Sequence, residues 1–371
     1  MIIGFDAKRI FHNASGLGNY GRDIVRILSN QFPENKYVLY NPKKPHINRI
    51  SLTSNIFVAY PMHKIWKMFP SVWRYGPVSK QIFNDKIDVF HGLSNEIPRG
   101  INKSRTKVIV TIHDLIFIRF PNLYHAADRT IYRIKLKYAL EKSDIILAIS
   151  EQTKRDIINL FEVDENKIIV HYQGCHPAFK TIYSDDEKES VQKRLGLPSN
   201  YLLIVGTIEK RKNALIVLKA IKDMKIHCVI VGKPTGYKDE LSVFIRENNM
   251  EGRIHFLKQV GVEDLSAIYQ MANIFCYPSI YEGFGIPIIE ALYSRVPVIT
   301  SKGGCFSEAG GPDSMYLDPY NAEDWKNAIC DLLKNEEKRK GMAKLGWQYV
   351  QKFNDEKIGE SLMSIYQHLM N

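Results

Sequence analysis

Cysteine is scarce in this sequence, and long apolar runs are missing from it. The five cysteines are scattered and none forms a C-x-x-C pair, which argues against a disulfide scaffold or a zinc knuckle and favours a reducing compartment. No apolar run approaches the ~18 residues of a membrane-spanning helix. The charged residues at positions 6, 8 and 9 do not suit a signal peptide. We therefore expect a soluble, cytoplasmic chain.

The composition carries no bias of the kind that marks disordered, collagen-like or coiled-coil chains. Apolar residues make up 45% and charged residues 25% of the sequence, which is ordinary for globular proteins. With 371 residues the chain has about twice the usual domain size. We therefore expect two domains.

Positive charge is concentrated in the first half of the chain. Residues 1–178 contain 26 Lys/Arg and 15 Asp/Glu, whereas residues 179–371 contain 25 of each, so the net charge of +11 belongs to the first part. A one-sided field of this kind suits an anionic partner: a nucleic acid, an anionic membrane surface or a phosphate-bearing substrate. A basic but inert surface is the alternative.

Short apolar runs alternate with amphipathic stretches in both halves, which predicts βαβ units and a parallel, doubly wound sheet in each half. The predicted strands are 2–5, 36–40, 56–59, 88–90, 108–112, 145–149, 167–170, 201–205, 227–231, 253–256, 274–276, 296–300 and 315–317. Helices are predicted at 17–29, 71–83, 126–140 and 152–160, and the chain is almost wholly helical after Asn321.

A break in this pattern at residues 174–184, which contain Gly, Pro and Ser, predicts the domain boundary. An acidic, helix-starting run follows at 185–189. We expect an N-terminal domain at 1–178, a second domain at 179–353 and a final helix at 354–371. Open α/β sheets bind ligands at the carboxyl ends of their strands, so two facing domains would hold the ligand in the cleft between them.

Residues 16–21 form a G-x-G-x-x-G pattern before a predicted helix. The pattern does not indicate a dinucleotide site, because the glycines do not follow the strand directly and the second strand ends Leu39-Tyr40-Asn41 without the required acid. We expect Gly16 and Gly18 to let backbone N–H groups lie close to a phosphate or a sugar. A turn that only needs positive φ angles is the alternative.

The most informative segment is 277–290, Tyr-Pro-Ser-Ile-Tyr-Glu-Gly-Phe-Gly-Ile-Pro-Ile-Ile-Glu. It predicts the end of a strand, a loop with two glycines, and an apolar helix that begins at about residue 285. The helix N-terminus suits a phosphate, and Glu282 and Glu290 suit hydroxyl groups. This combination describes a site for a nucleotide that carries a polyol, and helix caps with solvated glutamates are the alternative. The loop and helix start supply Gly283, Phe284, Gly285 and Ile286.

The spacing Glu282-x7-Glu290 around Glu-Gly-Phe-Gly resembles the E-x7-E motif of the retaining, GT-B-fold glycosyltransferases of family 4. The resemblance covers nearly the whole chain. It also includes Gly16 and Gly18, His113-Asp114 after a strand, the segment 206–213 (Gly-Thr-Ile-Glu-Lys-Arg-Lys-Asn) and the last helix at 356–370. It implies two Rossmann-like domains that face a central cleft, with the last helix returning to the N-terminal domain.

The resemblance further implies roles for single residues. Arg211, Lys212 and the amides at 284–286 would stabilise the departing diphosphate, while Glu282 would hold sugar hydroxyls and Glu290 the ribose. The reaction would retain the anomeric configuration by front-face attack, and we identify no nucleophilic carboxylate. The catalytic candidates are therefore His113, which would face the donor sugar, Arg211, Lys212 and Glu282. The donor-binding candidates are Gly16, Gly18, Gly206, Arg211, Lys212, Glu282, Gly283, Phe284, Gly285, Ile286 and Glu290.

Thr207 departs from the family pattern, in which many members carry Arg directly after the glycine that corresponds to Gly206 and Lys five residues later. Lys212 matches that lysine, and Arg211 is the candidate for the second cation. Together with residues 5–9 and 91–95, this version of the segment resembles the mannosyltransferase-like branch. It implies GDP-mannose as donor, and a glycan or polyprenyl-phosphate-linked glycan as acceptor in cell-surface polysaccharide synthesis.

Two further expectations concern metals and membranes. No Asp-x-Asp pair occurs in the sequence, so we expect no metal and no other cofactor. Residues 62–80 mix Trp, Phe and Tyr with Lys and Arg, which suits an anionic membrane surface or a lipid-phosphate acceptor. Pro70 excludes one long helix there, and aromatic side chains that pack into the domain core are the alternative.

Two other function classes fit parts of the sequence. A nucleotide-sugar 2-epimerase shares two facing α/β domains and would act without an acceptor. The other class is a non-catalytic binding protein. It would be either a degenerate transferase or an RNA binder with a basic groove. A degenerate transferase is disfavoured because Glu282, Gly283, Gly285 and Glu290 are intact together. No aromatic-rich recognition motif supports an RNA binder, so we expect no nucleic-acid partner.

Overall fold

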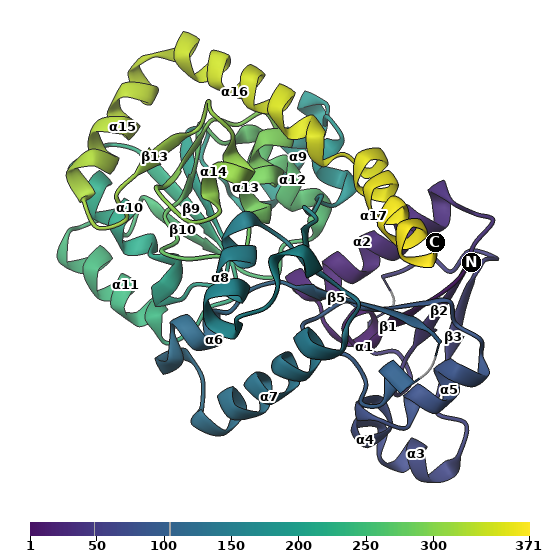
Figure 1. Ribbon diagram of the computed structural model, residues 1–371. Helices are drawn as coiled ribbons and strands as arrows, with labels where there is room; N and C mark the ends of the chain where they lie inside the picture. Colours follow the sequence, from purple (N-terminus) through teal and green to yellow (C-terminus); the bar gives the residue numbers. More distant parts are fainter. Residues whose placement is uncertain (48, 104) are drawn as a thin grey trace. The chain divides into compact units, whose positions relative to one another are not determined.

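The computed structural model describes residues 1–47, 49–103 and 105–371. The chain divides into two compact units. The first comprises Met1–Gly174 and Phe353–Asn371, and the second comprises Cys175–Lys352. Each unit contains one parallel sheet with helices on both faces (Figure 1). The predicted fold class, two doubly wound α/β domains, is confirmed.

The first unit is built on a seven-stranded sheet in the order β3-β2-β1-β4-β5-β6-β7. Its strands are β1 (Ile2–Asp6), β2 (Lys36–Tyr40), β3 (Ile56–Ala59), β4 (Val89–Gly92), β5 (Lys107–Ile112), β6 (Ile145–Ala148) and β7 (Ile168–Val170). The strand order reverses between β1 and β4, where Ile3 pairs with Val89. Most strand residues are buried on both faces, as is expected of a parallel sheet.

Helices cover both faces of this first sheet. They are α1 (Lys8–His12), α2 (Gly16–Gln31), α3 (Lys64–Met68), α4 (Pro70–Tyr75), α5 (Val78–Asn84), α6 (Ile116–Arg119), α7 (Ala126–Lys142), α8 (Glu151–Phe161) and α17 (Asp355–Met370). Single 3-10 turns lie at Ile101–Lys103, Pro121–Leu123 and Glu165–Lys167. One core joins α2 and α17 to the sheet, and a second joins α4, α5, α7 and α8 to its other face.

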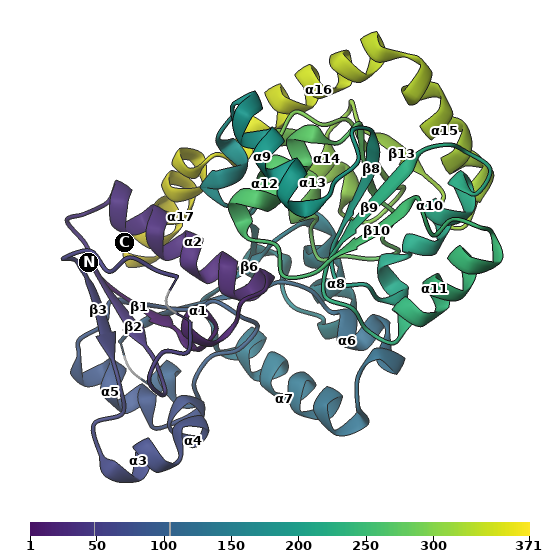
Figure 2. The ribbon, with the colours of Figure 1, turned by 180° about the vertical axis from the view of Figure 1, so that it is seen from behind.

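The last helix, α17, packs beside α2 within the first unit (Figures 1 and 2). Arg26 Nη1 donates to Asp355 Oδ2 over 2.8 Å, and Gln31 Nε2 donates to the Asp355 carbonyl over 2.8 Å. Tyr366 is fully buried and its hydroxyl lies 2.7 Å from His91 Nδ1. The C-terminal segment is therefore part of the first unit's core.

The second unit has a six-stranded sheet in the order β10-β9-β8-β11-β12-β13. Its strands are β8 (Tyr201–Val205), β9 (His227–Val231), β10 (Ile254–Leu257), β11 (Ile274–Tyr277), β12 (Val298–Ser301) and β13 (Met315–Leu317). Its helices are α9 (Asp185–Leu195), α10 (Ala214–Ile221), α11 (Tyr237–Glu247), α12 (Val262–Met271), α13 (Ile286–Tyr293), α14 (Phe306–Gly310), α15 (Ala322–Lys334) and α16 (Glu336–Val350). Single 3-10 turns lie at Pro177–Lys180 and Lys210–Lys212, and a third, Gln351–Phe353, crosses the unit boundary.

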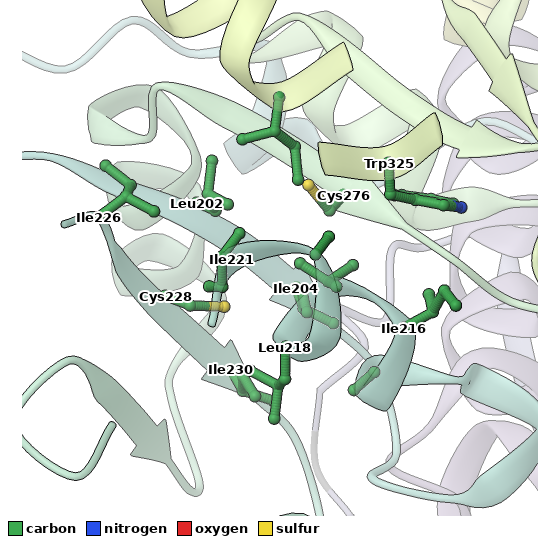
Figure 3. Close-up of a cluster of buried hydrophobic side chains, with 14 of the residues drawn as sticks. Leu202, Ile204, Ile216, Leu218, Ile221, Ile226, Cys228, Ile230, Cys276 and Trp325 are labelled. Carbon is green, nitrogen blue, oxygen red and sulfur yellow. The ribbon is translucent and has the colours of Figure 1, made fainter. Parts of the chain in front are cut away.

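In the second unit, α9, α12 and α13 lie over one face of the sheet and α10, α11 and α15 over the other (Figure 2). Leu202, Ile204, Cys228 and Ile230 from the strands pack against helical side chains of the second group, and Trp325 closes this core (Figure 3). The core fixes the ends of β8 and β11, from which the loops described below extend.

The strand predictions are confirmed in type and order, and no strand end differs by more than two residues. The single helix predicted at 71–83 is wrong, because α4 ends at Tyr75 and α5 begins at Val78, with Gly76 and Pro77 between them. The helix predicted from residue 185 begins there, and Ser184 and Glu187 form a capping box at its start.

The first unit ends at Gly174, four residues before the boundary that the sequence suggests. The turn Pro177–Lys180 belongs to the second unit because Ser266 of α12 donates to the Ala178 carbonyl over 2.9 Å. None of the helices within the described ranges is long and apolar enough to cross a membrane.

Candidate functional site

The strand order of the second sheet reverses between β8 and β11, which are adjacent. Doubly wound sheets bind ligands at the carboxyl ends of the strands on either side of such a reversal. Here the two loops at that point are 206–213, after β8, and 278–285, after β11. They contain most of the predicted donor-binding residues.

The loop after β8 begins at Gly206, whose φ of +142° is a conformation that side-chain-bearing residues rarely adopt. A Cβ at Gly206 would lie 3.6 Å from Lys212 Cε, so the lysine side chain passes directly over this glycine. A small pocket opens beside it. The pocket lining includes Gly206, Thr207, Glu209, Lys212, Tyr277 and Pro278.

Glu282 is the centre of a charged cluster between the two loops. Its Oε1 lies 2.5 Å from Lys212 Nζ and 2.8 Å from Arg211 Nη1, and it accepts a hydrogen bond from Ser279 Oγ. The Glu282 side chain is 11% exposed. Burial would raise the pKa of Glu282, but the charges of Lys212 and Arg211 lower it to about 2. The carboxylate is therefore ionised at neutral pH.

Arg211 joins the two loops. Its guanidinium donates to the Tyr281 carbonyl and to Glu209 Oε1, and its own carbonyl accepts from the Ile280 N–H over 2.9 Å. Both ends of the residue are thus used to hold the loop that carries Glu282. Thr207, the residue that departs from the resemblance, is exposed.

Lys212 contacts Tyr277 as well as Glu282. Its Nζ donates to the Tyr277 hydroxyl over 2.9 Å and lies 5.1 Å from the centre of the ring. Tyr277 and Ser279 also belong to this cluster, although neither was predicted as a site residue. The position of Tyr277 as the last residue of β11 is the signal that could have identified it, because residues at the carboxyl ends of central strands face the ligand-binding edge.

The helix α13 begins immediately after this cluster. Gly285 precedes it with φ of +147°, a conformation that favours glycine, and a Cβ there would also lie close to the Ala309 Cβ, at 3.3 Å. Phe284 is buried. Glu290 lies one turn into the helix, where its Oε2 accepts from the Tyr269 hydroxyl over 3.0 Å. The structure thus brings residues 206, 211, 212 and 282–290 to one edge of the sheet.

The charged cluster around Glu282 has no net charge. Arg211 and Lys212 contribute two positive charges, and Glu209 and Glu282 contribute two negative charges within ion-pair distance of them. An anion bound here would therefore have to share the two cations with these carboxylates. The partial positive charge at the start of α13 adds to the attraction for an anion.

His113 lies in the first unit, directly after β5, and is 6% exposed. Its Nε2 lies 2.8 Å from the Leu93 carbonyl and its Nδ1 lies 3.3 Å from Gln173 Nε2, so Nε2 carries the proton and Nδ1 accepts. Burial lowers the pKa of His113 to about 4. The ring is neutral at physiological pH and firmly positioned, and its role at the donor sugar stays a prediction.

Gly16 and Gly18 form the first turn of α2, and neither has a positive φ angle. A Cβ at Gly18 would lie 1.9 Å from the Asn13 carbonyl oxygen, whereas nothing lies within 4 Å of one at Gly16. Gly18 is therefore required by close backbone packing. Gly16 leaves open space at the helix start, and its contact with a ligand stays a prediction.

The aromatic and basic segment 62–80 divides into a buried part and an exposed part. Trp73 packs in the core of the first unit and Trp66 packs partly against it. Met62, Ile65, Met68 and Phe69 each expose more than half of their surface. In the described parts of the chain, no group of three or more His, Cys, Asp or Glu side chains is placed to hold a metal ion.

Two family models match the chain in succession. The model "Glycosyltransferase Family 4" matches residues 15–179 and the model "Glycosyl transferases group 1" matches residues 185–347. The chain is 27% identical to O-antigen chain mannosyltransferase B of Escherichia coli over 76% of its own length and 74% of that protein. It is 29% identical to O-antigen chain mannosyltransferase RfbU of Salmonella typhimurium over 60% of each chain.

Among solved structures, sucrose-phosphate synthase from Thermosynechococcus elongatus superposes with a TM-score of 0.79 at 19% identity. The match covers 100% of this chain and 99% of that one. The likeness therefore concerns the fold of each α/β unit and the order of its elements along the chain.

Proposed function

The chain belongs to the family 4 glycosyltransferases of GT-B fold, and from this premise we propose that it transfers mannose from GDP-mannose, with retention of anomeric configuration, to a glycan or a polyprenyl-phosphate-linked glycan in cell-surface polysaccharide synthesis. The two O-antigen chain mannosyltransferases among its relatives support the sugar and the type of product.

One observation carries the proposal: the buried Glu282 carboxylate, held by Lys212 and Arg211 at the point where the second sheet reverses its strand order. A carboxylate that is ionised and firmly positioned can accept hydrogen bonds from sugar hydroxyls. The cations beside it can bind the diphosphate of the same donor. Carboxylate and cations at this spacing therefore suit a nucleotide sugar better than a free nucleotide.

The reaction breaks the bond between the sugar C1 and the diphosphate oxygen and forms a bond from C1 to the acceptor oxygen. Negative charge grows on the departing diphosphate, where Lys212 and the start of α13 stabilise it. The acceptor hydroxyl gives its proton to the departing phosphate oxygen on the same face. Arg211 supports this step by holding the loop of Glu282, and Glu290 binds the ribose.

We further propose that the reaction needs no divalent metal. The sequence lacks the Asp-x-Asp pair that commonly holds a metal ion on the diphosphate. Lys212, Arg211 and the dipole of α13 would supply the positive charge that a metal ion would otherwise supply.

A membrane surface is the proposed location of the acceptor. Met62, Ile65, Met68 and Phe69 expose large apolar surfaces on α3 and beside it, and Lys64 and Lys67 are exposed on the same helix. Apolar and basic side chains on one short helix suit the headgroup region of an anionic bilayer. Contact there would bring the enzyme to a lipid-linked acceptor on the cytoplasmic side.

A thermal-shift panel with GDP, UDP, dTDP and ADP, each with EDTA present, tests the donor. A ligand at 100-fold its dissociation constant stabilises a protein by ~2.7 kcal/mol, which is readily measured. A shift with GDP alone is the expected result. A shift only with UDP or dTDP would contradict the mannose donor, and no shift with any of the four would contradict the nucleotide site.

Transfer itself is tested with GDP-mannose and an acceptor extract, with the anomeric configuration of the product read by NMR. Mannose epimerised in a mixture that contains donor alone would contradict transfer and favour an epimerase. The variant Glu290→Ala, compared in the same thermal-shift panel, shows whether the described edge binds the nucleotide.

A further inference from the structure

The first sheet repeats the topology of the second, and its reversal point also carries a charged cluster. The strand order reverses between β1 and β4. Around the carboxyl ends of these strands lie four positively charged and two negatively charged side chains, from β1, α1, α4, α7 and the loop after β4. We call them the β1–β4 cluster: Asp6, Lys8, Arg9, Arg74, Glu96 and Lys135.

Both carboxylates of the cluster are engaged by two of its cations. Arg74 is bound to Asp6 through two hydrogen bonds, one of them Nε to Oδ1 over 2.9 Å, and its Nη2 lies 2.6 Å from Glu96 Oε1. Lys135 Nζ lies 2.9 Å from Glu96 Oε2. Burial would raise the pKa of Glu96, but Arg74 and Lys135 lower it to about 2.

Lys8 and Arg9 are the remaining cations. Across residues 1–47, 49–103 and 105–371, no carboxylate lies within ion-pair distance of either side chain, and the buried Arg9 Nε has no hydrogen-bond partner. Burial lowers the pKa of Lys8, and the charges of Arg74 and Arg9 lower it further, while Glu96 and Asp6 act in the opposite direction. The charge of Arg9 also lowers the pKa of His113, which places Arg9 near that residue.

The two reversal points therefore differ in charge. The cluster around Glu282 contains two cations and two carboxylates, whereas the β1–β4 cluster contains four cations and two carboxylates. Two unmatched positive charges at a partly buried edge destabilise each other unless an anion joins them. The edge is also the place where a doubly wound sheet binds its ligand.

We propose that Lys8 and Arg9 bind a phosphate or diphosphate group of the acceptor substrate. The inference rests on the proposed function, since it assigns the acceptor of that transfer a chemical class. Asp6 and Glu96 hold Arg74 and Lys135 in place, and Lys8 and Arg9 supply the charge that the acceptor phosphate neutralises. The acceptor phosphate would thereby neutralise part of the excess positive charge of residues 1–178.

A binding experiment on the full chain tests this assignment directly. The probe is inorganic pyrophosphate, titrated by calorimetry with the donor site already saturated by the nucleoside diphosphate that binds best. The variant is Lys8→Gln/Arg9→Gln, and the matched control is Lys36→Gln/Lys142→Gln, which removes two exposed cations from the same unit.

We expect the Lys8→Gln/Arg9→Gln variant to bind pyrophosphate about tenfold or more weakly, with nucleoside diphosphate affinity unchanged. The control pair should match the unsubstituted chain. Equal pyrophosphate affinity in the variant and the control, or no pyrophosphate binding by the unsubstituted chain, would overturn the inference. If no nucleoside diphosphate binds, the proposed function fails, and the pyrophosphate titration without nucleotide still decides the role of Lys8 and Arg9.

The source of the phosphate is distinguished by transfer assays with three acceptors: a polyprenyl-diphosphate-linked sugar, a soluble sugar phosphate, and the same sugar without phosphate. The variant should raise KM for whichever phosphorylated acceptor is used and leave KM for the neutral sugar unchanged. A uniform fall in kcat on all three acceptors would contradict phosphate binding and indicate a structural role.

Discussion

Lys212 Nζ lies 2.5 Å from Glu282 Oε1, so a cation expected to bind the donor diphosphate and a carboxylate expected to bind the donor sugar neutralise each other. Arg211 is engaged in the same way. The site is thus held together by the groups that are expected to contact the substrate. Donor binding has to redistribute these contacts, because a diphosphate and Glu282 compete for the same lysine.

This competition predicts opposite effects of Glu282→Gln on binding and on turnover. Without the carboxylate charge, Lys212 and Arg211 attract the diphosphate more strongly, so the nucleoside diphosphate should bind several-fold more tightly. Transfer should be at least about tenfold slower, because an interaction with the sugar is lost. Calorimetry and a transfer assay measure the two effects, with the exposed Glu247→Gln as control. Weaker nucleotide binding by the variant would count against the competition.

Lys212→Gln should weaken the binding of the nucleoside diphosphate, whereas Glu282→Gln should strengthen it. A hydrogen bond to a charged group contributes about 1.5–3 kcal/mol, so the affinity for the nucleoside diphosphate should fall about tenfold to a hundredfold. The affinity for the corresponding nucleoside, which lacks phosphate, should not change. Lys210→Gln is the matched control, since Lys210 is exposed on the same turn. Equal losses for nucleoside and nucleoside diphosphate would mean that Lys212 does not contact the phosphates.

Metal independence gives a third prediction. Transfer by the purified chain should continue at an unchanged rate in EDTA, because Lys212, Arg211 and α13 already provide positive charge for the leaving group. The assay compares rates with EDTA, with magnesium and with manganese. Loss of activity in EDTA that manganese restores would refute the prediction.

The sequence predicts the strands well because each is a short apolar run that a parallel sheet buries on both faces, as 201–205 and 227–231 illustrate. It fails at residues 71–83, where periodicity continues through Gly76 and Pro77 although Pro77 has no N–H for a helix. The local sequence pattern therefore predicts which helices and strands exist better than it predicts where they begin and end.

The site is predictable only to the extent that its residues are close in sequence. Glu282, Gly285 and Glu290 were recognised together, and so were Arg211 and Lys212. The sequence could not show that Glu282 pairs with Lys212, 70 residues away, or that Arg74 pairs with Asp6. Such pairs depend on which strand ends are neighbours, and that is a property of the sheet order.

Three buried histidines predict how the stability of the first unit depends on pH. Burial lowers the pKa of His91 to about 3 and those of His113 and His171 to about 4, from an ordinary 6.5. Below pH 6.5 the unfolded chain takes up protons that the folded chain does not bind, so stability is full above that pH and falls toward pH 4. Each histidine contributes up to ~1.4 kcal/mol per pH unit.

Urea unfolding between pH 7.5 and 5 measures this effect. This pH range ends above the ordinary pKa of the carboxylates. The slope of the free energy of unfolding against pH therefore reports the protonation of histidines. His171→Gln should reduce the first unit's contribution to the slope by about one third, because one of its three buried histidines is removed. Stability that stays constant from pH 7.5 to 5 would show that these rings are protonated in the folded chain.

The exposed apolar side chains of α3 lead to a prediction about membranes. Ile65 and Met68 should insert between headgroups while Lys64 and Lys67 contact anionic lipids, at ~1 kcal/mol for each basic residue near the surface. The chain should therefore sediment with phosphatidylglycerol vesicles and less with phosphatidylcholine vesicles. Ile65→Asp/Met68→Asp should lower the bound fraction at least about tenfold, because two charges replace the inserting groups.

The control for this experiment is Ile182→Asp/Tyr320→Asp, which changes two exposed apolar residues of the second unit in the same way. If both double variants lose vesicle binding equally, the contact is not specific to α3. If the unsubstituted chain does not sediment with anionic vesicles at all, the acceptor must reach the enzyme in solution. A phosphate on such an acceptor would still require Lys8 and Arg9, so membrane contact and phosphate recognition can be tested separately.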